Sequence, residues 1–190
     1  MHAIIHVFTY KAGLLARLAH DLQLTVESHQ LTLQGRQLRG HCAADSLRID
    51  GVPGSKGLDT HTLSANDKQQ ISETIRNEIL QTDRHPRIEF EGEIAGAGAG
   101  NDKLQVRGTL RLRGQARSIA VDVTRNADRL HCAFELTPSQ FGIAPYKALA
   151  GAIKLQDRVG VTIDVLLEGQ NPVDILGGSS PVQLNAATGD

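Results

Sequence analysis

The eight histidines are the residues of this 190-residue chain most able to carry chemistry. If the N-terminal segment is a strand, His2 and His6 point to the same side of it, which is a geometry that metal ligands can use. No His-Glu-x-x-His motif occurs, and in a strand the neighbours His20 and Asp21 would face opposite sides. We therefore expect no resident metal or cofactor. His20 can instead orient a loop or meet the polar head of a ligand at the mouth of a cavity.

Motifs for nucleophilic catalysis and phosphate binding are missing from the sequence. There is no Gly-x-Ser-x-Gly elbow, and neither Cys42 nor Cys132 has the neighbours of a catalytic cysteine. Residues 96–102 are glycine-rich but lead into an alternating stretch rather than a helix, so they predict a hairpin loop. Residues 51–57 predict an exposed turn. A Ser-His-Asp triad needs only to meet in space, but nothing positive indicates an enzyme or a catalytic residue.

Composition excludes two further classes of function. The net charge is −1, with no Trp and 3% aromatic residues, so neither a basic field nor stacking platforms favour nucleic-acid binding. No apolar run reaches the roughly 18 residues needed to cross a bilayer as a helix. The N-terminus lacks the features of a secretory signal, which predicts a cytoplasmic protein. The cysteines occupy apolar positions and are expected to be core residues, with a single bridge left open.

Alternation of apolar and polar residues with a period of two dominates the chain and predicts a mainly β protein of about eight strands. An antiparallel sheet of this size must pair its edges in a sandwich or close into a barrel. The clearest segments are 159–167, 104–113, 119–123 and 130–136, with weaker ones at 22–33, 38–49 and 88–94.

Helical periodicity is clear in one segment. Ile71, Ile75 and Ile79 recur every four residues, and Ser64 with Asp67 resembles a capping box, so one amphipathic helix is expected over about 65–81. Residues 11–18 suit a short helical turn or a bulged strand. Residues 169–190 are rich in Gly, Ser and Pro and predict a loose C-terminal tail after a domain of residues 1–168.

Four stretches together resemble the YceI-like family. Residues 108–123 are similar to a strand–turn–strand of that family, and residues 79–90 resemble its segment in which an acidic residue and an x-Pro step precede a strand. Residues 136–143 match its Phe-Gly-Ile corner, and residues 159–167 match its closing strand. The usual Asp-x-x-His-Ser opening is not evident. The resemblance spans roughly residues 5–168.

The resemblance implies an antiparallel, eight-stranded, lipocalin-like barrel with one helix beside it. Its interior would hold an amphiphile such as a polyisoprenoid or an isoprenoid quinone. The expected function is non-catalytic binding, sequestration or transport of a long-chain isoprenoid-like or other lipid. The alternatives are a protein-interaction module with a filled barrel and, with less support, a His/Asp-dependent hydrolase or isomerase. Resemblance and general frequency suggest a homodimer.

Residues of one strand parity must line such a barrel, and an irregular segment near residue 141 resembles a gate. Whether the lining side chains fill the barrel or face a ligand depends on its volume, which the sequence does not give. The expected ligand-binding residues are Phe8, Leu14, Leu18, His20, Leu110, Leu112, Val121, Phe134, Leu136, Phe141, Tyr146, Leu149, Val161 and Ile163.

Overall fold

The computed structural model describes residues 2–12, 20–97, 103–126, 128–148, 153–167 and 181–186. Strands account for most of these residues, because segments of alternating polarity bury one face and leave the other to water. In chain order the elements are β1 (His2–Lys11), β2 (Leu22–Val26), β3 (His29–Gln34), β4 (Gln37–Ala43), β5 (Leu47–Gly54), β6 (Gly57–Asp59), α1 (Ala65–Thr74), the π-helix η2 (Ile75–Leu80), β7 (Arg87–Ala97), β8 (Lys103–Leu112), β9 (Gln115–Asn126), β10 (Arg129–Leu136), the 3₁₀-helix η3 (Pro138–Phe141), β11 (Lys147–Ala148), β12 (Ile153–Leu166) and β13 (Val182–Ala186).

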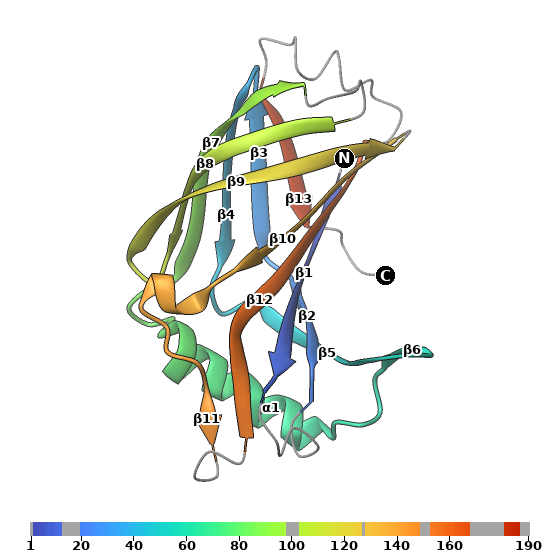
Figure 1. Ribbon diagram of the computed structural model, residues 1–190, viewed down its shortest axis with the longest axis vertical. Coiled ribbons are helices and arrows are strands. Elements are labelled where there is room, and N and C mark those ends of the chain that lie inside the picture. Colours follow the sequence, from blue (N-terminus) through green and yellow to red (C-terminus); the bar gives the residue numbers. More distant parts are fainter. Residues whose placement is uncertain are drawn as a thin grey trace.

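The sheet closes on itself as a barrel (Figure 1). The closed ring runs β12-β10-β9-β8-β7-β4-β3-β13-β1 and returns to β12 through the β1–β12 pairing. Every neighbouring pair in this ring is antiparallel except β1 and β13. The prediction of a mainly β barrel with one helical segment is therefore confirmed. The number of strands in the ring is nine rather than eight.

The difference in strand number has a local cause. The predicted strands 22–33 and 38–49 are each interrupted, so that they appear as β2 with β3 and as β4 with β5. On one side of the interruption β2 pairs with β1, and on the other side β3 pairs with β13. If β2 with β3 and β4 with β5 are each counted as one interrupted strand, and the short strands β6 and β11 are left out, eight antiparallel strands remain besides β13. Strand β13 fills the gap between β3 and β1.

Strand β13 corrects the expectation of a loose tail for residues 182–186. Val182 pairs with Leu33 and Leu184 with Leu31 on β3, while Asn185 pairs with His2 on β1. The side chain of Leu184 is buried. The strand is held because it covers backbone groups and apolar surface that would otherwise face water at the gap. The domain boundary after residue 168 stays a prediction.

The helical segment lies across the end of the barrel opposite β13 (Figure 1). Ser64 caps α1 by a capping box: its hydroxyl accepts a hydrogen bond from the Asp67 backbone N–H, and the Asp67 carboxylate accepts one from the Ser64 N–H. The helix continues as η2 and ends at Gln81, whose φ of 52° is left-handed. The predicted helix is confirmed, with its last six residues in π form.

Two clusters of buried residues lie at different places around the helix. Leu22, Leu24 and Ile49 form one cluster between β2, β5 and the helix, where Ile71 and Ile75 pack on it. The second cluster includes Leu80 and Phe141 and brings η2 against the ends of β8 and η3. The helix is therefore fixed to the barrel by apolar contacts along its length.

Candidate ligand cavity

An apolar cavity of about 590 Å³ occupies the half of the barrel that the helix covers. Its wall is built from alternate residues of the strands, as the pleat requires: Ile5, Val7 and Thr9 on β1, and Val161 and Ile163 on β12. The helices α1 and η2 form the remaining side of the cavity. This volume falls in the range of ligand sites in proteins. The interior of this half of the barrel is open, which argues against the filled barrel of the interaction-module alternative.

Many lining residues are only half-buried although they point into the barrel. Examples of half-buried lining residues are Val7, Phe134, Leu136, Val159 and Ile163. In a filled barrel these inward side chains would interdigitate and lose their accessible area. Their remaining accessibility is consistent with contact with the cavity, which offers apolar surface to a ligand.

The end of the cavity toward β13 is closed by side chains. Leu31, Phe90 and Ile163 line the cavity and pack at the same time against a cluster of buried residues beyond it. The buried members of that cluster are Ala3, Leu33, Ile94, Val106, Val165, Leu167 and Leu184. None of these seven residues lines the cavity. The described residues at this end of the barrel therefore pack against one another, whereas those beneath the helix surround the cavity.

Polar groups occur at the other end of the cavity. His20, Gln70, Gln156 and Arg158 are exposed lining residues. The Arg158 guanidinium donates to the Glu135 carboxylate at 2.9 Å and lies 4.4 Å from the centre of the Tyr10 ring. An apolar interior with a polar rim is the arrangement that accommodates an amphiphile.

Thr9 carries an unsatisfied polar group beside this apolar interior. Its hydroxyl oxygen is buried and has no hydrogen-bond partner among the described residues, and Thr9 lines the cavity. An unsatisfied buried hydroxyl costs about 1–3 kcal/mol. A ligand oxygen within reach would satisfy it.

His29 is a buried histidine at the first residue of β3, just after β2, the strand that pairs with β1. Its Nδ1 lies 3.1 Å from the Val26 carbonyl oxygen, and its Nε2 lies 3.2 Å from the Ala3 carbonyl oxygen. Burial lowers the pKa of His29, and the two carbonyl groups oppose this shift only in part. The neutral ring has one N–H and can donate to only one of the two carbonyl oxygens at a time. His29 thus ties two strands together where the sheet pairing changes.

This environment predicts that His29 makes the fold less stable in acid. The folded-state pKa lies below the ordinary value of 6.5, so the unfolded chain binds the proton first as the pH falls. The stabilisation is complete above pH 6.5 and is lost progressively below it. We expect the urea midpoint of the protein to fall more steeply below pH 6.5 than that of His29→Gln, which keeps a donor but does not titrate. Parallel pH profiles for the two proteins would contradict the assignment.

Both cysteines are free thiols in the structure. Cys42 lines the cavity, and burial raises its pKa to about 11. Cys132 is buried, and burial followed by the charge of Asp122 raises its pKa to about 11. Both are therefore protonated and weakly nucleophilic near neutral pH.

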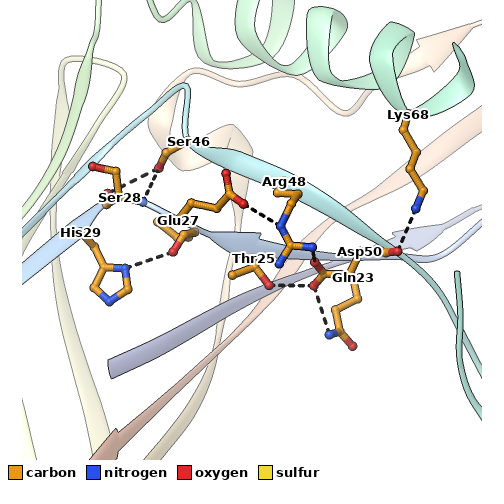
Figure 2. A network of polar contacts seen from close by, with 10 residues as sticks. Gln23, Thr25, Glu27, Ser28, His29, Ser46, Arg48, Asp50 and Lys68 are labelled. Carbon is orange, nitrogen blue, oxygen red and sulfur yellow. Dashed lines mark hydrogen bonds and ion pairs between the residues drawn. The ribbon is translucent and has the colours of Figure 1, made fainter. Parts of the chain in front are cut away.

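Outside the cavity, a network of polar contacts links the helix to β5 and β2 (Figure 2). The buried Asp50 carboxylate accepts hydrogen bonds from the Thr25 hydroxyl at 2.8 Å and the Gln23 amide at 3.3 Å, and it pairs with Arg48 at 2.9 Å. Lys68 reaches from α1 and donates to the Asp50 backbone oxygen at 3.1 Å. This network holds the helix in position over the cavity.

Eight of the fourteen expected ligand-binding residues line the cavity. They are His20, Leu110, Leu112, Phe134, Leu136, Tyr146, Val161 and Ile163. Their contact with a ligand stays a prediction. Leu14, Leu18 and Leu149 lie outside the described residues, as do residues 13–18 of the segment whose form was left open. Residues 98–102 of the expected hairpin loop also lie outside, but β7 and β8 on either side of them pair antiparallel.

Phe8, Val121 and Phe141 do not line the cavity. Phe8 has the opposite parity to Ile5, Val7 and Thr9, so it faces away from the barrel interior. Val121 packs against the cluster that fills the closed end. Phe141 is 1% exposed and belongs to the cluster around Leu80.

Sequence reasoning missed two kinds of lining residue. Ile71, Ile75 and Ile79 were expected only as the packed face of a helix, but they also form one wall of the cavity. Thr9 and His29 were not singled out, because a polar residue in an alternating stretch is expected to face water. For Thr9, the apolar Ile5 and Val7 at the same parity were the available signal.

The described residues contain neither a metal centre nor a helix able to span a membrane. No three His, Cys, Asp or Glu side chains of those ranges are grouped so that they could hold a metal ion. No helix in that part of the chain is long and apolar enough to cross a membrane.

Comparison with known proteins gives one family and several related structures. Residues 20–167 match the family model of the YceI-like domain. No curated protein matches the chain. BcnA of Burkholderia cenocepacia is similar with a TM-score of 0.59 and 13% identity over 85% of this chain and 94% of that one. A polyisoprenoid binding domain from Saccharophagus degradans has a TM-score of 0.56 and 12% identity over 85% of this chain and 91% of that one. At these identities the two likenesses establish the fold alone.

Proposed function

Because the chain belongs to the YceI-like domain family, we propose that it binds one amphiphilic lipid inside the barrel and thereby carries or sequesters it. The observation that carries this proposal is the apolar cavity of about 590 Å³ beneath the helix. Burial of each methylene group of a tail contributes about 0.8 kcal/mol, from which the cost of association is subtracted. An apolar tail is therefore sufficient to drive binding without covalent chemistry.

The ligand class that we propose is isoprenoid-like. Support comes from the related Saccharophagus degradans structure, which is described as a polyisoprenoid binding domain. The head of the ligand would lie toward the polar rim, where His20 is exposed, and an oxygen of the ligand would accept from or donate to the Thr9 hydroxyl. We propose binding alone, with no catalytic step.

The test measures whether the cavity is the binding site. Val159→Trp adds bulk to a half-buried lining residue, whereas Thr162→Trp adds the same ring on the opposite parity of β12. We expect native mass spectrometry of gently purified protein to show one bound lipid in the wild type and in Thr162→Trp. The bound fraction should fall at least about tenfold in Val159→Trp, which is about 1.4 kcal/mol.

Thermal unfolding of both variants establishes that they are folded. If no lipid co-purifies, purified protein is mixed with geranylgeraniol as a probe. A wild type that neither retains lipid nor takes up this probe would refute the proposal. Equal binding by the two tryptophan variants would place the lipid somewhere other than the cavity.

A further inference from the structure

The closed end of the cavity is built on pairs of glycines and larger side chains. Gly92 on β7 and Gly108 on β8 face each other in register. A Cβ atom at Gly92 would lie 2.7 Å from the Phe90 Cζ atom, and one at Gly108 would lie 2.5 Å from the same atom. The Phe90 ring therefore lies over the two glycines, in space that any other residue there would occupy.

The Leu31 side chain lies over a glycine of the neighbouring strand β4 in the same way. A Cβ atom at Gly40 on β4 would lie 2.5 Å from the Leu31 Cδ2 atom. Leu31 and Phe90 both line the cavity and both contact the buried cluster that fills the barrel beyond them. Together with Ile163 they make an end wall, which we call the Phe90 wall. A ligand tail that reaches this wall meets the packed side chains of that cluster.

We infer that the Phe90 wall stops the tail of the bound lipid and thereby sets which prenyl chain lengths the cavity prefers. This inference rests on the proposed function, and it adds the size of the ligand to it. A shorter tail fits between the polar rim and the wall, whereas a much longer tail has to leave part of its length outside the cavity.

The test uses competition among tails of different length. Lipid-free protein is mixed with equimolar prenyl alcohols of two to nine isoprene units, and the bound alcohols are identified by mass spectrometry. The wild type is expected to retain mainly the shorter alcohols, and those of eight and nine units least. Removal of the Phe90 ring frees roughly 100 Å³, so Phe90→Ala should shift the distribution by about one unit toward longer chains.

Two variants make the result specific. Phe8→Ala removes the same ring from the outward parity of β1 and should leave the length distribution unchanged. Leu31→Ala removes a second side chain from the Phe90 wall. It serves as the test variant if thermal unfolding shows that Phe90→Ala is not folded. A shift toward longer chains in either wall variant, absent in Phe8→Ala, supports the inference.

Different results of this experiment would refute the inference and the proposed function. If the wild type binds prenyl alcohols of eight or nine units as well as the shorter ones, the Phe90 wall does not limit the tail. Unchanged distributions in folded wall variants lead to the same conclusion. In both cases lipid binding itself stands. If the wild type retains none of the alcohols and no other lipid, the proposed function fails and the inference fails with it.

Discussion

Ending the chain at residue 180 is expected to lower the free energy of unfolding by about 4 kcal/mol, because it removes β13. Leu184 is 8% exposed, and it packs with Leu33 and Ala3 in the cluster at the closed end of the barrel. Loss of its side chain alone exposes apolar surface worth about 2–3 kcal/mol. Loss of the strand also leaves backbone groups of β3 and the first residues of β1 without their pairing.

Urea unfolding followed by circular dichroism measures this effect. Gln183→Ala is the matched control, because Gln183 lies on the same strand but is exposed. It should change the free energy of unfolding by no more than about 0.5 kcal/mol. Leu184→Ala should lie between the control and the truncated chain. A truncated chain as stable as the full one would mean that β13 contributes nothing to closure of the barrel.

Phe141→Ala is expected to lower the free energy of unfolding by about 3–5 kcal/mol, the cost of a large cavity in a packed core. Phe141 is 1% exposed among Ala44, Leu80, Leu112 and Ile143. Its ring does not line the ligand cavity, so lipid binding per folded molecule should stay at the wild-type value. The variant thus separates the packing role from the ligand contact that the sequence suggested.

Two measurements on one sample decide the role of Phe141. Thermal unfolding reports the loss of stability, and native mass spectrometry well below the midpoint reports the bound fraction. Phe8→Ala, which removes a half-buried ring from the outward parity of β1, should lose less stability. A Phe141→Ala protein of normal stability but without lipid would restore Phe141 as a ligand contact and contradict its assignment to the core.

The fold was largely predictable because most strands bury one face. Segments such as 104–113 and 159–167 alternate over many residues. The first coincides with β8 to within one residue at each end, and the second forms the later part of β12, which begins six residues earlier at Ile153. β13 was not predictable in the same way. Five residues give too few alternations, and its partners β1 and β3 are far away in the sequence, so only the gap between those strands specifies it.

The candidate site was predictable in its walls but not in its volume. Parity placed Leu110, Leu112 and Val161 among the inward residues, and all three line the cavity. Phe8 was expected near the mouth of the barrel and does not line the cavity. Parity could not have placed it, because β1 is apolar on both faces at Ile4, Ile5, Val7 and Phe8. Whether inward residues meet each other or a cavity depends on the distance between strands, which no local pattern encodes.

The pairing of β1 with both β12 and β13 has a consequence for how the protein is made. His2 pairs with Leu166 and with Asn185, so β1 cannot complete its pairing until the much later strands β12 and β13 have been synthesised. Contacts of this sequence separation are slow to form and leave strand edges unpaired in the meantime. We therefore expect the ring to close only after β12 and β13 have been made, which leaves the inward faces of the earlier strands exposed until then.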